Sequence, residues 1–145
     1  MELASSLQTS APFARVWMRA EVEWQCGGRS GAITSVLSEN GRRGVLTGYA
    51  MEVNGAPADA RVAIVEDLLW GDLDDAQQSA LLKRLMQTAA ARGCHTASCP
   101  ILGYTSLEPL VNAGFGRGNR IVHAYLTLWN GPHPEPISSL YIDVF

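Results

Sequence analysis

The stretch that decides the fold is RVAIVEDLLWGDLDDAQQSALLKRLMQTAAARG, residues 61–93. Its first five residues form a β-branched run, which favours a central strand. Farther along, Asp74 or Asp75 can accept hydrogen bonds from the free amides that open a helix. Gln78 stands three residues after Asp75, which is the spacing of a capping box. We therefore predict a strand at 61–65 and a helix that begins near residues 74–75.

The helix predicted after this start is amphipathic. Its apolar residues fall on one stripe at helical spacing: Leu81, Leu82, Leu85, Met86 and Ala89. The polar residues Lys83, Arg84 and Gln87 face elsewhere. Arg92 then places a cation at the C-terminal end, where the helix dipole favours it, and Gly93 ends the helix. One face of this helix is therefore expected to be buried.

Toward the N-terminus, the pattern predicts strands. Residues 15–25 alternate between apolar and polar side chains, which is typical of a half-exposed strand. A second strand is predicted at 32–37 and a third at 45–53, joined by a turn at Asn40-Gly41, because these two residue types tolerate positive backbone dihedrals. Residues 1–12 show no period and are expected to be loosely ordered.

Toward the C-terminus, shorter elements follow. We predict a strand at 96–102, a helix at 106–113 with Pro109 in its first turn, a strand at 121–129 and an edge strand at 140–145. The chain of 145 residues has the length of one domain. Together these elements predict one α/β (α+β) domain over residues 1–145, with a mixed, mainly antiparallel sheet and flanking helices.

Composition excludes several classes of function. The formal net charge of -3 gives no broad basic field for nucleic acid and no polybasic stretch for an anionic membrane. No apolar run is long enough to span a bilayer. Cys26, Cys94 and Cys99 are an odd number of cysteines at low density, which suits reduced thiols. We expect a cytoplasmic protein with neither nucleic-acid nor membrane partners.

Two further patterns, one of cysteine and histidine and one of tryptophan, bear on possible binding sites. Cys94, His95 and Cys99 carry metal-ligating groups, but on an extended strand the two cysteines point to opposite faces, so we predict no metal site. Four tryptophans are many for this length and indicate either core packing or a subunit interface. Trp70, a few residues after the predicted central strand, could either line a ligand slot or fill it.

The order of elements from residue 61 to residue 129 resembles the Gcn5-related N-acetyltransferase (GNAT) superfamily, over roughly the C-terminal two thirds of the chain. The resemblance rests on the strand, the long helix ending at Arg92-Gly93, a strand, a short helix ending at Gly114 and a final strand. In that family the helix opens with the motif (Arg/Gln)-x-x-Gly-x-(Gly/Ala), where x is any residue. The amides of the motif hold the pyrophosphate of acetyl-CoA, because the positive end of the helix attracts an anion.

The resemblance implies an acyl-CoA site in this chain. The backbone of Leu68, Leu69 and Trp70 would hold the pantetheine arm. The pyrophosphate would lie on Ala76, Gln77, Gln78 and Ser79. The motif departs from the family pattern, since Leu73 stands at the first Arg or Gln and neither Ala76 nor Gln78 is glycine. Asp72, Asp74 and Asp75 surround the site, and a carboxylate about 5 Å from a phosphate costs on the order of 1–3 kcal/mol.

The resemblance also implies catalytic roles. The family's general base is commonly a carboxylate on the central strand, and of Glu66 and Asp67 we choose Glu66. Leu110 stands where the family has its acid tyrosine, so Tyr104 is the nearest phenol for a general acid. The family builds its acceptor site from two helices after the first strand. With a strand predicted at 15–25, a homodimer partner or the C-terminal tail would have to supply that site.

Three hypotheses therefore stand. The first is an acyl-CoA-dependent N-acyltransferase with a small-molecule amine as acceptor. The second is a noncatalytic GNAT-like module that has lost CoA binding and binds another small ligand or a protein partner, its slot closed by Trp70 and the aspartates. The third is a small-ligand binding domain of another α/β fold. Titration with acetyl-CoA separates the first two.

Overall fold

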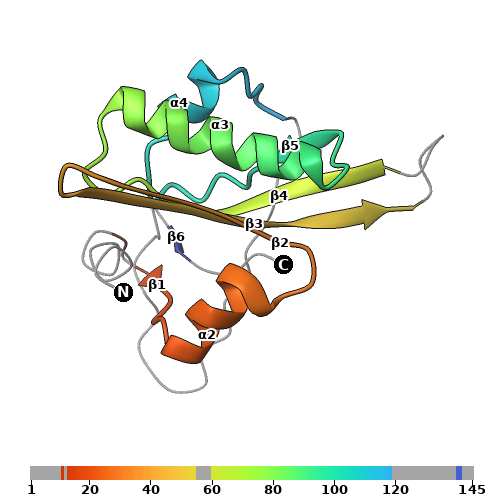
Figure 1. Cartoon of the computed structure of the whole chain (residues 1–145), viewed down its shortest axis with the longest axis horizontal. Coiled ribbons are helices and arrows are strands. Elements are labelled where there is room, and N and C mark those ends of the chain that lie inside the picture. Colours follow the sequence, from red (N-terminus) through yellow and green to blue (C-terminus); the bar gives the residue numbers. More distant parts are fainter. Residues whose placement is uncertain (1–10, 12, 55–59, 119–139, 142–145) are drawn as a thin grey trace.

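A computed structural model of the chain describes residues 11, 13–54, 60–118 and 140–141. The helices and strands are, in order, β1 (Phe13–Ala14), α2 (Arg19–Glu23), the π-helix η1 (Trp24–Gly28), β2 (Ala32–Glu39), β3 (Arg42–Val53), β4 (Ala60–Leu69), α3 (Asp75–Ala91), β5 (Thr96–Ser98), α4 (Glu108–Asn112) and β6 (Leu140–Tyr141). Helices α3 and α4 lie on one face of the main sheet, and α2 lies on the other (Figure 1).

The main sheet has the strand order β2-β3-β4-β5. Its first three strands are antiparallel, whereas β4 and β5 are parallel. A second, two-stranded sheet joins β1 to β6 in parallel. The predicted fold class, α/β with a mixed and mainly antiparallel sheet flanked by helices, is therefore confirmed.

The hairpin between β2 and β3 turns where the sequence predicted it. Asn40 and Gly41 have φ angles of 52° and 81°, in the left-handed region that Asn and Gly tolerate best. Both strands are longer than predicted, because their ends pair as far as Glu39 and Arg42. The open edge of β2 is covered by α3, since Arg84 Nη1 donates to the Val36 carbonyl at 3.1 Å and Arg92 Nη1 donates to the Ala32 carbonyl.

The strand predicted at residues 15–25 was wrong, because this segment forms α2 and the start of η1. Contacts at helical spacing stabilise it: Arg19 pairs with Glu23 at 2.9 Å, and the Glu21 carboxylate accepts from the Met18 amide at 2.9 Å. The apolar side chains that suggested a buried strand face are largely outside the core, since Met18 and Trp24 are exposed. A short helical layer therefore lies on this face of the sheet in place of the predicted strand.

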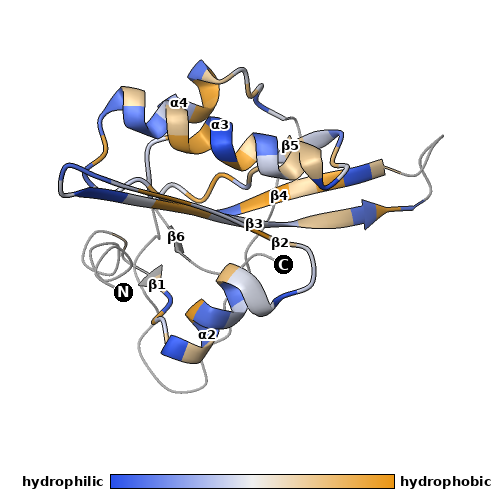
Figure 2. Cartoon of the chain, viewed as in Figure 1, coloured by the Kyte–Doolittle hydropathy of each residue, from blue (hydrophilic) through white to orange (hydrophobic). Residues whose placement is uncertain are grey.

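The core lies between α3 and the sheet, as the amphipathic pattern predicted. The buried stripe of α3 consists of Leu81, Leu82, Leu85 and Ala89, with Met86 partly buried. It packs against Ile33, Leu46, Val65 and Leu68 of the strands. Figure 2 shows the hydrophobic colouring along β4 and in α3. Burial at about 25 cal/mol per Å² of apolar surface makes this layer the main source of stability.

The C-terminal elements are shorter than predicted. The strand expected at 96–102 pairs only over Thr96–Ser98, and the helix expected at 106–113 spans Glu108–Asn112 with Pro109 in its first turn. The strand predicted at 121–129 lies outside the described residues. Of the predicted edge strand, Leu140–Tyr141 is observed. Of the expected loose start at 1–12, only Ala11 is described, and it is buried. No described helix has the length and apolar character needed to cross a membrane.

Candidate active site

The central feature of the site is the separation of β4 from β5. The two strands pair at Val62, Ala63 and Ile64, after which β4 continues to Leu69 without β5. A bulge coincides with this separation: Thr47 of β3 pairs with Asp67 and Gly48 with Val65, which leaves Glu66 as the extra residue. Bulges bend a strand and increase its twist. A Cβ on Gly48 would overlap the Ile64 carbonyl oxygen, so glycine permits the close approach of the two strands here.

Glu66, the predicted general base, is buried on the face of the sheet that α2 and η1 cover. Only 5% of its side chain is exposed. Its Oε2 atom accepts from Gln25 Nε2 and from Arg29 Nη1, the latter at 2.8 Å. Within the described part of the chain, its Oε1 atom is buried with no hydrogen-bond partner. One oxygen of Glu66 is therefore fixed in place, while the other keeps its capacity to accept a hydrogen bond.

Arg29 is held by two aromatic rings as well as by Glu66. Its guanidinium lies 3.5 Å from the centroid of the Tyr49 ring and 5.2 Å from that of Trp24. Burial raises the pKa of Tyr49, and the nearby Arg29 cation opposes that rise. The sequence reasoning missed Gln25 and Arg29, because residues 15–25 were predicted to be a strand. The Arg-Glu spacing of Arg19 and Glu23 was the signal that could have indicated a helix.

Asp67, the other carboxylate of the bulge, has a different environment. It is buried, and it accepts a hydrogen bond from Thr47 Oγ1 on the neighbouring strand. Thr47 and Asp67 are direct partners in the sheet register, so this contact stays within the ladder. Of the two carboxylates, Glu66 is the one with a buried oxygen, Oε1, that has no hydrogen-bond partner among the described residues.

Tyr104, the predicted general acid, lies in the loop after β5 and reaches back to β4. Its hydroxyl donates to the Glu66 carbonyl oxygen at 3.1 Å and accepts from the Leu68 amide at 3.0 Å. Burial raises the pKa of Tyr104 far above its ordinary value. The phenol is therefore neutral at physiological pH. It bonds to backbone groups on the part of the β4 edge that does not pair with β5.

The residues predicted to hold the pantetheine arm are the last two of β4 and the residue that follows it. Leu68, Leu69 and Trp70 are all buried. The amide of Leu68 is already bonded to Tyr104. The Trp70 ring belongs to the main core, and its Nε1 donates to the Ser106 carbonyl at 3.1 Å. Trp70 therefore ties the loop after β5 to the end of β4.

The first turn of α3, where the pyrophosphate was predicted, is capped by its own residues. Asp74 is the N-cap: its carboxylate accepts from the Gln77 amide at 3.0 Å, and Gln77 Oε1 accepts from the Asp74 amide at 3.2 Å. The capping box thus uses Asp74 and Gln77 instead of the predicted Asp75 and Gln78. Gln78 Nε2 donates to the Leu73 carbonyl at 2.8 Å. Ala76 and Ser79 are exposed on the same turns.

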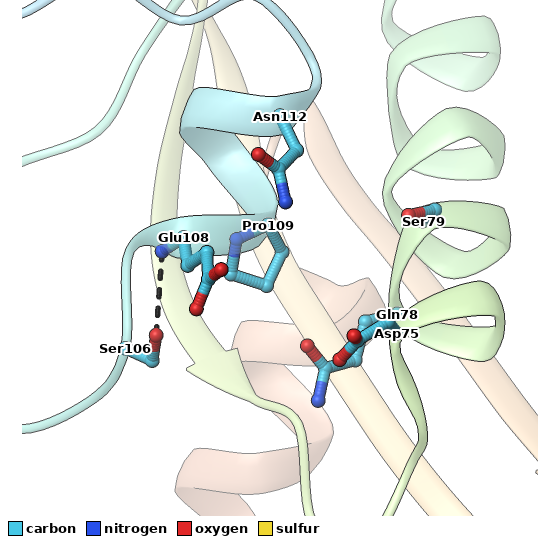
Figure 3. Close-up of a pocket in the computed structure, with 7 residues that line it drawn as sticks. All are labelled: Asp75, Gln78, Ser79, Ser106, Glu108, Pro109 and Asn112. Atoms are coloured by element: carbon cyan, nitrogen blue, oxygen red, sulfur yellow. Dashed lines mark hydrogen bonds between the residues drawn. The ribbon is translucent and has the colours of Figure 1, made fainter.

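A cavity of about 150 Å³ lies between α3 and α4 (Figure 3). It is lined by Asp75, Gln78, Ser79, Ser106, Glu108, Pro109 and Asn112. The predicted positions Gln78 and Ser79 therefore do face a hollow beside the helix start. The volume is below the roughly 300–1,000 Å³ of sites for drug-sized ligands. The carboxylates of Asp75 and Glu108 among its lining residues oppose the binding of a phosphate.

Of the cysteine and histidine pattern, Cys99 is not activated as a nucleophile. Burial raises the pKa of Cys99 to about 12, so its thiol stays protonated at neutral pH. Cys94 and Cys99 pack beside the main core as partly buried side chains. Across residues 11, 13–54, 60–118 and 140–141, no cluster of three or more His, Cys, Asp or Glu residues could hold a metal ion.

Comparison with known proteins places the fold. No protein-family model and no curated protein matches the sequence. Among solved structures, an acetyltransferase of Trypanosoma brucei matches with a TM-score of 0.63 and 20% identity, covering 86% of this chain and 89% of that one. An aminoglycoside acetyltransferase from an uncultured soil metagenomic sample, in complex with trehalose, matches with a TM-score of 0.65 and 15% identity over 88% and 84%. The same enzyme in complex with sisomicin gives 0.64 and 14% over the same shares.

These similarities define the fold of the chain. It is the fold of acetyltransferases, matched over more than four fifths of each chain compared. The expected GNAT-like fold is thereby confirmed, and at 20% identity or below the similarity concerns the fold alone.

Proposed function

We propose that this protein is an acyl-CoA-dependent N-acyltransferase whose acceptor is a small-molecule amine. The observation that carries the proposal is Glu66, a buried carboxylate at the bulge of β4 with one oxygen fixed by Gln25 and Arg29. Its other oxygen has no hydrogen-bond partner among the described residues. A group of this kind can take a proton from an amine as the nitrogen attacks an acyl carbon.

The residues around β4 fit an acyl donor in part. The end of the strand, Leu68–Trp70, is parted from β5 and would hold the pantetheine arm by its backbone. Residues 76–79 of α3, of which Gln78 and Ser79 line a cavity, would face the pyrophosphate. When bound, acyl-CoA would supply an activated thioester. Glu66 would take the proton from the amine, and Tyr104 is the candidate to protonate the leaving thiolate.

The acceptor is proposed from the site and from one neighbour in the comparison. An amine donates the hydrogen bond that Glu66 Oε1 lacks. The aminoglycoside acetyltransferase of the same fold has been solved with sisomicin, which makes aminoglycosides a reasonable first panel. We further propose a homodimer in a reducing, cytoplasmic setting, supported by the exposed apolar side chains of Val16, Met18 and Trp24 and by three free thiols. Sedimentation at several concentrations tests the dimer.

The test of the enzyme hypothesis has two stages. Calorimetric titration with acetyl-CoA should give micromolar affinity, and Ala76→Glu should weaken it at least tenfold by adding a carboxylate to the first turn of α3. Thiol release with a panel of amines should then fall by about 10²- to 10⁴-fold in Glu66→Gln, with the affinity for acetyl-CoA kept. Asp67→Asn is the matched control and should keep the larger part of the turnover. If acetyl-CoA does not bind at millimolar concentration, the enzyme hypothesis is refuted. If Glu66→Gln keeps full turnover, the role of Glu66 as the base is refuted.

Specific contacts favour the second hypothesis, a noncatalytic GNAT-like module. The Tyr104 hydroxyl bonds to the Glu66 carbonyl and the Leu68 N–H, the backbone groups that an acyl-CoA molecule would use. Asp74 satisfies an amide of the α3 start, and Asp75 and Glu108 line the adjacent cavity. If acetyl-CoA fails to bind at millimolar concentration, this hypothesis replaces the first.

A further inference from the structure

The edge of β4 beyond Ile64 presents a pair of backbone groups. These are the carbonyl of Glu66 and the N–H of Leu68, both contacted by Tyr104 from the side that β5 has left. In a parallel sheet, a carbonyl and an amide two residues apart on one edge bond to the N–H and the C=O of a single residue of the next strand. We call this pair the open edge of β4. It matches a ligand that carries secondary amides along an extended chain.

Tyr104 satisfies both groups of the open edge with one atom. Its hydroxyl oxygen lies 3.1 Å from the Glu66 oxygen and 3.0 Å from the Leu68 nitrogen, which are distances of ordinary neutral hydrogen bonds. Its ring contacts both hydrophobic clusters, the main core and the smaller one formed by Ala11, Trp17 and Leu69. The contact therefore closes the open edge without any β5 residue.

The residues on either side of Tyr104 are tied to other parts of the chain. Gly103, with φ of 77°, belongs to a β-bridge, and Ser106 accepts a hydrogen bond from the Trp70 indole N–H. Release of the contact therefore requires the phenol itself to move away from β4, which breaks its two hydrogen bonds and disturbs the packing of its ring. A ligand that supplies two hydrogen bonds of the same kind offsets the first cost, and the remaining cost lowers its affinity by roughly ten- to a hundredfold.

We propose that Tyr104 is a gate: its phenol closes the open edge of β4, and an acyl donor binds by displacing it, so that the N–H of one secondary amide donates to the Glu66 carbonyl and the C=O of the next amide accepts from the Leu68 N–H. The inference rests on the proposed function, because it takes acyl-CoA as the ligand. It assigns Tyr104 a role in donor binding that is separate from the general-acid role predicted from sequence.

The test compares Tyr104→Phe with the wild type, using CoA itself so that no acyl transfer takes place. The substitution keeps the ring and removes the hydroxyl. We expect Tyr104→Phe to bind CoA about tenfold more tightly in calorimetry. By NMR, the Leu68 amide should exchange slowly in the wild type with or without CoA. In Tyr104→Phe it should exchange fast alone and slowly with CoA. Thr88→Val, which removes a hydroxyl contact to the Arg84 carbonyl on α3, is the matched control and should bind CoA as the wild type does.

The outcomes separate the gate from the function. If the wild type binds CoA and Tyr104→Phe binds no more tightly, the gate is overturned while the function stands. If Tyr104→Phe binds CoA and protects Leu68, but neither protein transfers an acyl group to any amine, the gate is supported and the function fails. If neither protein binds CoA, both are overturned.

Discussion

The environment of the Glu66 side chain is set by residues that are distant in the sequence. As the extra residue of the β4 bulge, its side chain meets Gln25 and Arg29, which stand 41 and 37 residues earlier in the chain. The pair with Arg29 is buried, since the side chains are 15% and 5% exposed. A buried carboxylate depends strongly on its partner, because the desolvation cost remains when the partner is removed.

At this scale we predict the effect of Arg29→Met. The change leaves Glu66 without its cation and removes the stack on Tyr49, so the free energy of unfolding should fall by about 3–5 kcal/mol. Arg19→Met breaks the exposed pair with Glu23 and should cost below about 0.5 kcal/mol. Urea unfolding of both variants measures the difference. Equal losses would show that the Arg29–Glu66 pair has no special energetic role.

The elements divide into those that local sequence defines and those that it does not. The start of α3 was predicted from residues close together in the sequence, with Asp74 or Asp75 as the N-cap, although the capping box forms between Asp74 and Gln77 and not between Asp75 and Gln78. The α2 and η1 segment was mispredicted because alternating apolar residues over 16–24 match a strand period, while helical ion pairs and caps are weaker signals. The π-helix then turns Gln25 and Arg29 toward β4, which the strand prediction could not anticipate.

The prediction at the element scale concerns the cap of α3. Asp74→Ala removes the acceptor of the Gln77 amide and also the exposed ion pair with Arg42 at 2.7 Å. Arg42→Ala removes the ion pair alone. We expect Asp74→Ala to lower the free energy of unfolding by about 1 kcal/mol more than Arg42→Ala does. Chemical denaturation of the two variants gives this difference, and a value near zero would mean that the capping bond contributes nothing.

At the scale of the whole molecule, the fold buries groups that titrate at alkaline pH. Burial raises the pKa of Cys99 from 9.0 to about 12 and raises that of Tyr104 above its ordinary value. The native state therefore holds these protons more tightly than the unfolded chain does. The stability that they contribute is complete below about pH 9, and it is lost as pH rises from 9 toward 12.

We therefore predict a fall in stability above pH 9 that depends on these two residues. One thiol with such a shift contributes about 1.36 kcal/mol per pH unit of slope over this range. Cys99→Ala should reduce the slope between pH 9 and 10, and Tyr104→Phe should reduce it above pH 10. Urea midpoints at pH 8, 9, 10 and 10.5 measure the slope. A slope that neither substitution changes would contradict the assignment.

The sequence by itself determined the central strand, the amphipathic helix after it, the Asn-Gly hairpin and the place of Glu66 on β4, because each depends on residues close together in the chain. Only the tertiary structure decided what surrounds Glu66 and Leu68. Gln25, Arg29 and Tyr104 reach β4 from 36 to 41 residues away, and such contacts follow from packing across the sheet, which local periodicity does not encode.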